Sequence, residues 1–478
     1  MPDMRNHNCG THFFIPDSKS VTMKRYILTA AIALATGCMA AAPAGSWWGK
    51  LSLGVRGSLR IVIDLATDPV DGRMTATLKS PDQSDRAIPA SVDFCSDDSI
   101  AVSVAQLGAA YRAHVTDGRM SGTFSQGGAS FPLDMIPGDG SYARPQTPTA
   151  PSGYTAEEVR FVNHAAGDTL AGTLCVPDGA TGSTPVVLLV TGSGLQNRDE
   201  ELAGHRPFAV IADRLAREGI ASLRYDDRGF GESTGNGTSA TTYDFASDAS
   251  AGTAYLRGLD RFGSVGVLGH SEGGTIAVML AGDDDANAAP DFIISLAGGI
   301  VPGRDILITQ NRKMLVLAGY SPEIADTYCS ALNDLWSGTA ATATDTSALP
   351  QELRTNLLMI PMHTAKSPWT KTFLALDPSE YIRNIKCPVM AVNGTLDCQV
   401  DAADNLGALD RLLPADTRRN IVTYPGLNHL LQPAITGMPD EYPSIAVTIA
   451  PEVLDDITAW IKRVSHQRRR GAGVSACR

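Results

Sequence analysis

The chain has 478 residues, of which 43% are hydrophobic and 19% are charged, and its formal net charge is −12. This composition is typical of a globular protein and excludes a chain dominated by disordered or membrane-spanning sequence. An acidic chain is not expected to bind nucleic acid, because recognition of phosphate requires a basic surface. The length predicts more than one folded unit, since a single core rarely grows beyond about 250–300 residues.

A signal sequence is predicted near the N-terminus. Lys24 and Arg25 precede an apolar stretch from Ile27 to Ala35, and small residues follow it. This stretch is shorter than the roughly 20 residues that a transmembrane helix needs, so it indicates export rather than a membrane span. We therefore expect residues 23–44 to be a signal peptide and residues 1–22 to be a non-native upstream extension.

Two processing sites compete within the predicted signal peptide. The sequence LATGC, which ends at Cys38, resembles a bacterial lipobox, in which the cysteine would carry a lipid anchor, although Ala35 stands where leucine is preferred. The sequence Ala42-Pro43-Ala44 instead fits cleavage by an ordinary signal peptidase. Both outcomes predict an exported protein, either periplasmic or a lipoprotein of the outer membrane.

Short β-strands are predicted for residues 45–143. Apolar residues alternate with other residues from Leu59 to Leu65, and Asp-Gly and Gly-Gly pairs separate the runs. We expect a small all-β sandwich or barrel that acts as a scaffold, with substrate binding or dimerisation as alternatives. The proline-rich residues 144–153 are predicted to be a linker, because proline disfavours both helix and sheet interior.

Strands and helices alternate in residues 154–465. Short apolar runs typical of strands lie at 185–191, 221–227, 264–269, 292–298, 387–394 and 419–426. Amphipathic helical patterns lie between several of them, for example at 208–219. Such alternation predicts parallel strands joined by right-handed crossovers, and therefore an α/β fold with a doubly wound, mostly parallel sheet.

Two further segments are expected in this second unit. Residues 302–385 have a mostly helical, irregular pattern and are predicted to be a lid insertion above the carboxyl ends of the strands, where open α/β sheets bind ligands. Residues 466–478 contain three consecutive arginines and are predicted to be a solvated basic tail.

The pattern G-x-S-x-G occurs twice in the second unit. Ser271 lies between an apolar strand and a helix-like segment, which is the strand–turn–helix context that a nucleophile elbow requires. Such an elbow exposes the serine to substrate, where a base can activate it. Ser233 lies in the other copy, within a glycine-rich loop that no helix follows, and is predicted to be a turn residue. Ser271 is therefore the candidate nucleophile.

The acid and the base of a catalytic triad are expected downstream of the serine, in that order. Asp397 follows the strand at 387–394, and His429 follows the last strand. His429 is predicted to deprotonate the serine, and Asp397 to orient the imidazole and stabilise its cation. Asp401 or Asp404 would replace Asp397 if the loop is longer than expected. The other histidines considered are interpreted as surface or packing residues: His205, His270, His363 and His466.

An oxyanion hole should accompany the triad. Each N–H donor to the oxyanion typically lowers the barrier by about 2.7–4 kcal/mol. One donor is expected to be the backbone N–H of Glu272. The second is expected in the loop TGSGLQNRD, with Ser193 as the first choice and Gly194 as the second. Thr191 stands where many hydrolases have a histidine, and a plain glycine turn is the alternative interpretation.

Metal-binding motifs are absent from the sequence. It contains neither a C-x-x-C pair nor an H-E-x-x-H helix, so no zinc site is expected. Export permits disulfides, and Cys387 and Cys398 are candidates for a pair across the end of a strand, although spacing alone does not decide this.

Five segments in order, TGSGLQNRDE, RYDDRGFGES, GHSEGG, NGTLDCQV and PGLNHLL, resemble bacterial carboxylesterases of the α/β-hydrolase superfamily over about residues 150–461. The segments SPDQSDRAIPA and FSQGGASFPL are similar to the β-rich domain that precedes the hydrolase in an exported subgroup. The resemblance implies hydrolysis of a small-molecule carboxylic ester without metal or organic cofactor. It assigns the catalytic roles to Ser271, Asp397 and His429.

Other activities occur on the same fold, because a fold hosts many chemistries. A serine aminopeptidase is one alternative, and it would need an acidic cluster for the substrate amine, for which Glu272 and residues 199–201 are the candidates. A thioesterase is another. A non-catalytic binding protein is disfavoured by the intact set of serine, aspartate and histidine.

Overall fold

The computed structural model describes residues 44–475 except 53–57, 70, 82, 284–288 and 339–341. The predicted upstream extension and all but the last residue of the predicted signal peptide lie outside the described residues. The chain divides into two compact units, with the boundary between Ala143 and Arg144. Within the described residues, no helix combines the length and the apolar character needed to cross a bilayer.

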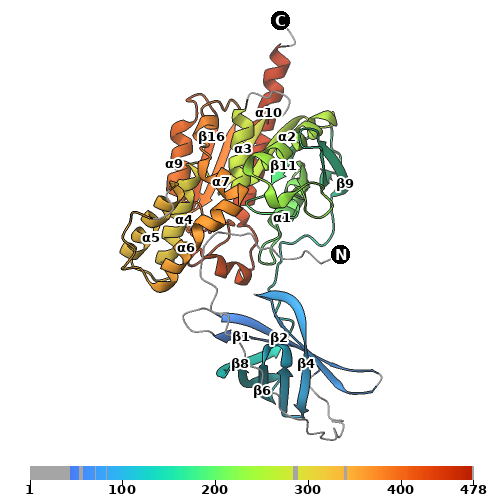
Figure 1. Ribbon diagram of the computed structural model, residues 1–478. Coiled ribbons are helices and arrows are strands. Elements are labelled where there is room, and N and C mark those ends of the chain that lie inside the picture. The colour runs from blue at the N-terminus through green and yellow to red at the C-terminus, as the bar shows by residue number, and fades with distance from the viewer. Residues whose placement is uncertain are drawn as a thin grey trace. The chain divides into compact units, whose positions relative to one another are not determined.

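The first unit is a closed antiparallel barrel of eight strands within residues 44–143 (Figure 1). The strands are β1 (Gly45–Ser52), β2 (Ser58–Thr67), β3 (Met74–Ser80), β4 (Ser84–Cys95), β5 (Ser99–Val104), β6 (Ala109–Thr116), β7 (Arg119–Gln126) and β8 (Ala129–Pro137). Each strand pairs with the next, and β8 closes on β1, where Trp48 lies opposite Ile136. The all-β prediction is confirmed as a barrel.

Alternate side chains of these strands fill the barrel. In β5 every second residue is buried, as a strand with one face on a core requires. The interior contains large side chains such as Trp47, Tyr111, Phe124 and Met135. The Tyr111 hydroxyl donates a hydrogen bond to the carbonyl of Leu133 at 3.0 Å, which satisfies the one polar atom of that buried ring. An eight-stranded barrel of this kind is a packed core.

The second unit is built on an eight-stranded sheet in the order β16-β15-β14-β13-β11-β12-β10-β9. The strands are β9 (Tyr154–Asn163), β10 (Asp168–Pro177), β11 (Pro185–Val190), β12 (Ala221–Tyr225), β13 (Ser264–His270), β14 (Phe292–Leu296), β15 (Val389–Gly394) and β16 (Arg419–Tyr424). Strands β11 to β16 are parallel, whereas β10 pairs antiparallel with both β9 and β12. The expected mostly parallel sheet is confirmed, with an antiparallel edge that the sequence analysis missed. Strand β9 is largely exposed and polar, so it lacks the apolar run that marks the inner strands.

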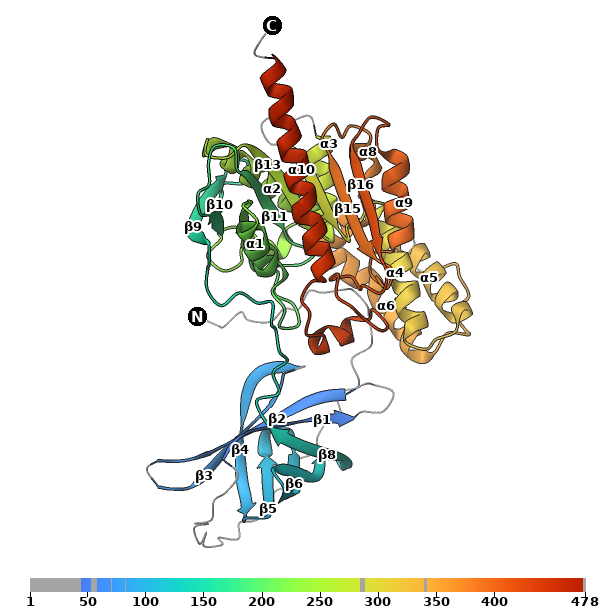
Figure 2. The same ribbon diagram turned by 180° about the vertical axis from the view of Figure 1, so that it is seen from behind.

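Helices cover both faces of this sheet. Helices α1 (Pro207–Arg217) and α10 (Pro451–Ser475) pack on one face, and they stand in front of the strands in Figure 2. Helices α2 (Thr242–Gly258), α3 (Glu272–Gly282) and α9 (Ala402–Leu412) pack on the other face. Helix α10 continues to Ser475, so the residues expected to form a separate basic tail from 466 onward begin inside a helix.

The segment between β14 and β15 is helical. It contains α4 (Gly303–Leu317), α5 (Pro322–Trp336), α6 (Gln351–Lys366), α7 (Pro368–Ala375) and α8 (Ser379–Ile382), and α4 to α6 group together in Figure 1. These helices have an apolar cluster of their own, around Tyr328, Leu332 and Leu353. The segment thus has its own packing, and its role as a lid stays a prediction.

Residues 144–153, expected to be a linker, are attached to the α/β unit at their start. The Arg144 guanidinium donates to the carbonyls of Pro443 at 2.7 Å and Ala203 at 2.9 Å. The Gln146 side chain donates to the carbonyl of Ile449 at 2.7 Å. The composition correctly indicated irregular backbone, but it contained no signal for these long-range bonds.

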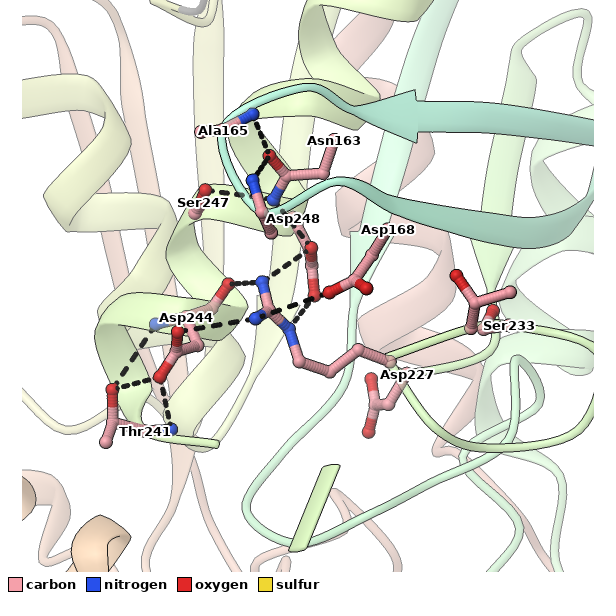
Figure 3. A network of polar contacts seen from close by, with 12 residues as sticks. Asn163, Ala165, Asp168, Asp227, Ser233, Thr241, Asp244, Ser247 and Asp248 are labelled. Carbon is pink, nitrogen blue, oxygen red and sulfur yellow. Dashed lines mark hydrogen bonds and ion pairs between the residues drawn. The ribbon is translucent and has the colours of Figure 1, made fainter. Parts of the chain in front are cut away.

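A buried ion pair ties the loop after β12 to helix α2 (Figure 3). Arg228 donates to both carboxylate oxygens of Asp248, at 2.7 and 2.8 Å, and to the carbonyl of Asp244 at 2.7 Å. Asn163, at the end of β9, donates to Asp248 at 2.8 Å. In the same loop, the Ser233 hydroxyl is buried and donates to the carbonyl of Asp226 at 2.7 Å, so Ser233 is part of a turn.

Replacing Arg228 with alanine is expected to lower the free energy of unfolding by about 3–5 kcal/mol, because it leaves the Asp248 carboxylate buried and unpaired. Urea denaturation of the α/β unit measures this. Arg261→Ala is the matched control, since Arg261 pairs with Glu157 at the surface and such pairs contribute about 0–1 kcal/mol. Equal losses in the two variants would contradict the prediction.

Candidate active site

Ser271 occupies a strained turn between β13 and α3. Its φ is 53° and its ψ is −118°, a conformation that non-glycine residues adopt only where the surrounding structure imposes it. Close packing around the turn explains the flanking glycines. A Cβ atom on Gly269 would lie 1.9 Å from the Gly273 carbonyl oxygen, and one on Gly273 would lie 2.0 Å from the Val190 carbonyl oxygen. The serine is half-buried at the start of helix α3.

Asp397 and His429 form a buried hydrogen-bonded pair at the carboxyl ends of β15 and β16. His429 Nδ1 lies 2.8 Å from Asp397 Oδ2. Because a carboxylate oxygen only accepts, Nδ1 carries the proton and the basic nitrogen is Nε2. Asp397 Oδ1 accepts from the backbone N–H groups of Gln399 and Val400, both at 2.8 Å. Every carboxylate oxygen of Asp397 is therefore engaged.

The alternative acids take other roles. Asp401 accepts from the backbone N–H of Asp404 at 2.9 Å and so caps the N-terminus of α9. Asp401 also forms an ion pair with Lys313 of α4. Asp397 is thus the carboxylate that reaches His429.

The elbow and the histidine loop lie side by side. His270 precedes Ser271, and its Nε2 donates to the backbone carbonyl of His429 at 3.0 Å. A Cβ atom on Gly192 would lie 3.2 Å from Ser271 Cβ, so the loop after β11 also reaches the serine. The Ser271 hydroxyl makes no hydrogen bond within the described residues, and catalytic hydrogen bonds are often long in free enzymes. The bond between Ser271 and His429 stays a prediction.

Three backbone N–H groups remain candidates for the oxyanion hole. Those of Glu272, Ser193 and Gly194 have no protein acceptor among the described residues. The N–H of Gly192, in contrast, donates to Glu200 Oε1 at 2.8 Å. The amide at the start of a helix is favourably placed for developing negative charge. Both predicted donor segments are therefore available.

The loop that carries Ser193 is held by buried carboxylates. Asp227 accepts from the Thr191 hydroxyl and from the backbone N–H of Gln196, both at 2.8 Å. Arg198, further along the loop, forms an ion pair with Asp226 at 2.8 Å. Burial raises the pKa of Asp227 well above its usual value, although these hydrogen bonds oppose the shift. This anchoring role was not predicted, and the only signal for it in the sequence is the Asp-Asp pair directly after a strand.

The helical insertion contacts the site at two points. The Trp369 indole of α7 donates to Glu272 Oε1 at 2.8 Å and to Oε2 at 3.0 Å. The Thr242 hydroxyl donates to the same carboxylate at 2.5 Å, and burial raises the pKa of Glu272. Lys313 of α4 donates to the backbone carbonyl of Asp397 at 2.9 Å. The insertion therefore touches both the elbow and the acid loop.

The described cysteines are free thiols. Cys387 and Cys398, candidates for a disulfide, are both free thiols. In the part of the chain that the structure describes, no group of three or more His, Cys, Asp or Glu side chains is placed to hold a metal ion.

Comparison with known families decides the relationship of this chain. The model of the X-Pro dipeptidyl-peptidase family, S15, matches residues 166–412, which is just over half of the chain. The chain belongs to the S15 family. The matched residues of this S15 protein include the elbow, the acid loop and the whole helical insertion.

Similar proteins include several esterases. Esterase EstD of Thermotoga maritima is 26% identical over 299 residues, which cover 61% of this chain and 65% of EstD. The S15 chain thus spans slightly less than two thirds of that relative. An esterase of Pyrococcus furiosus is 16% identical with a TM-score of 0.41, covering 68% of this chain and 98% of its own. Est1E of Butyrivibrio proteoclasticus is 17% identical with a TM-score of 0.38, covering 65% and 98% respectively.

The resemblance indicated by the motifs is confirmed. This S15-family chain has an α/β-hydrolase fold and a β-rich N-terminal unit, and an esterase is among its relatives.

Proposed function

We propose that this S15-family protein hydrolyses carboxylic esters through an acyl-enzyme on Ser271. The observation that carries the proposal is the buried His429–Asp397 pair, which lies beside a strained serine elbow. The pair leaves Nε2 of His429 as a base, and the elbow presents a hydroxyl at the start of a helix.

The proposed reaction has two steps. Ser271 Oγ attacks the ester carbonyl carbon while His429 Nε2 takes the hydroxyl proton, and the N–H groups of Glu272 and of Ser193 or Gly194 stabilise the oxyanion. The intermediate breaks down when His429 returns the proton to the departing alkoxide. Water then attacks the acyl-enzyme by the same route and releases the acid. Asp397 holds the imidazole and stabilises its cation throughout.

A serine peptidase is the second candidate, and the match to the X-Pro dipeptidyl-peptidase model favours it. An aminopeptidase requires a carboxylate free to bind the substrate amine. The four candidate carboxylates are already bonded within the protein: Glu272 to Trp369, Glu200 to His270, Asp199 to Arg224 and Glu201 to Arg206. This supports the esterase proposal.

A substrate panel separates these activities. We expect kcat/KM to be highest for p-nitrophenyl esters of short acids and lower for the matching acyl thioesters and for X-Pro p-nitroanilides. Steady-state kinetics on the full chain measures each value. A higher kcat/KM for an X-Pro p-nitroanilide than for every ester would contradict the esterase proposal and support the peptidase.

A further inference from the structure

His270 connects three active-site loops through one buried ring. Its Nε2 donates to the carbonyl of His429 at 3.0 Å, and its Nδ1 lies 2.8 Å from Glu200 Oε1. The same oxygen accepts the N–H of Gly192 at 2.8 Å. Since His270 directly precedes Ser271, the ring joins the nucleophile, the base loop and the loop expected to hold the second oxyanion donor.

The contacts of this ring define its protonation. A backbone carbonyl only accepts, so Nε2 carries a proton. The Glu200 carboxylate also only accepts, and its Oε1 takes the Gly192 N–H as well, so Nδ1 donates to it and His270 is an imidazolium paired with a carboxylate. Burial alone would lower the pKa of His270, but the charge and hydrogen bond of Glu200 raise it above its usual value, with help from the His429 carbonyl and the Asp397 charge.

The surroundings of the pair are apolar. A void of about 10 Å³ beside it is lined by Pro207, Phe208, Ile211, Leu296, Leu430, Leu431 and Ile449. The titratable groups that face His270 are Glu200, the adjacent His429 ring, whose centroid is 4.8 Å away, and Asp397 beyond it. Electrostatic interactions are strengthened in such a setting because water is excluded.

The conformation of Glu200 in the His270–Glu200 pair lowers the stability of the fold. Glu200 Oε2 is buried and has no hydrogen-bond partner within the described residues, and Glu200 itself has a φ of 53°. A buried polar atom without a partner costs about 1–3 kcal/mol. A site selected only for packing would not retain this arrangement, so it indicates a functional requirement.

We propose that His270 is a positioning residue, whose imidazolium holds the base loop and the oxyanion loop in register with Ser271. This inference rests on the proposed serine-hydrolase function. When His270 loses its proton, the Nδ1 lone pair faces the Glu200 carboxylate, and the bridge to the oxyanion loop is lost. Because the pKa of His270 is raised, the bridge is complete at low pH and is lost as the pH rises through that pKa.

The test uses the rate at which a fluorophosphonate modifies Ser271, together with ester turnover, both measured from pH 5 to 10 on the full chain. In the wild type we expect both the labelling rate and ester turnover to decline at alkaline pH, because His270 loses its proton. In His270→Gln we expect labelling rate and kcat to fall about 10- to 100-fold with KM little changed, and the alkaline decline to disappear. His205→Gln is the matched control, because His205 is also buried and bonded, to Thr448 and Tyr442, but its ring bonds neither Glu200 nor His429. It should keep the wild-type pH profile.

The outcomes separate the inference from the proposed function. If His270→Gln keeps the wild-type rate and alkaline decline while Ser271 is still labelled, the positioning role is overturned and the hydrolase proposal stands. If the wild type is not labelled at Ser271, the proposed function fails and the inference fails with it. Should His270→Gln not fold, Glu200→Gln tests the same bridge from its other end. Removing the Glu200 charge should move the alkaline decline in labelling rate and turnover to lower pH. A decline at the same pH as in the wild type would overturn the proposal.

Discussion

Replacing Ser271 with alanine is expected to lower kcat for an activated ester by about 10⁴- to 10⁶-fold, because the attacking hydroxyl is lost while the oxyanion donors remain. The fold should be retained, since alanine must adopt the same positive φ as serine and the Ser271 hydroxyl makes no hydrogen bond within the described residues. Turnover of a p-nitrophenyl ester and the thermal unfolding temperature measure the two effects. Fluorophosphonate labelling should be abolished in the same variant.

Ser233→Ala is the matched control for this experiment, because Ser233 lies in the other G-x-S-x-G sequence. Its hydroxyl donates to the Asp226 carbonyl and accepts from the backbone N–H of Ala171 at 2.9 Å, so its loss should reduce stability but not labelling. A modified peptide that contains Ser233, or one that still forms in Ser271→Ala, would remove Ser271 from the mechanism.

Replacing Asp397 with asparagine is expected to lower kcat by about 10⁴-fold with little change in the fold. Asp397 Oδ1 accepts two backbone N–H groups, so the amide oxygen of asparagine must take that place. The amide NH₂ would then face His429 Nδ1, which would have to accept. This forces the proton onto Nε2, and a protonated Nε2 is unable to take the proton of Ser271.

Steady-state kinetics at neutral pH, where the histidine tautomer decides the rate, measures this loss. Asp404→Asn is the control, because Asp404 lies seven residues beyond Asp397 and three beyond the cap residue Asp401, on an exposed turn of α9. Its kcat should stay within about twofold of the wild type, as expected for a surface substitution. Equal losses in both variants would show that charge in this loop, and not the bond to His429, supports activity.

The local residue pattern was sufficient to predict the inner strands of the sheet and the nucleophile elbow. The apolar runs at 185–191 and 264–269 became β11 and β13 within one residue, because strands buried on both faces need continuous apolar sequence. The elbow was equally predictable from the sequence, because close contacts with nearby residues and with the adjacent strand require glycine at positions 269 and 273. The edge strand β9 was not predicted, because half of its residues face solvent and it therefore lacks a continuous apolar run.

The amino-acid sequence was therefore enough to predict the fold class, the order of the chemical groups along the chain, and the serine that stands in a strained turn. The folded structure was needed to establish that Asp397, and not Asp401, reaches His429, that Asp227 anchors the loop of Ser193, and that His270 with Glu200 bridges three loops. These contacts join residues from 31 to 159 positions apart. Periodicity and spacing report only on neighbours within a few turns or strands, so bonds between distant loops become visible only once the sheet has brought its carboxyl ends together.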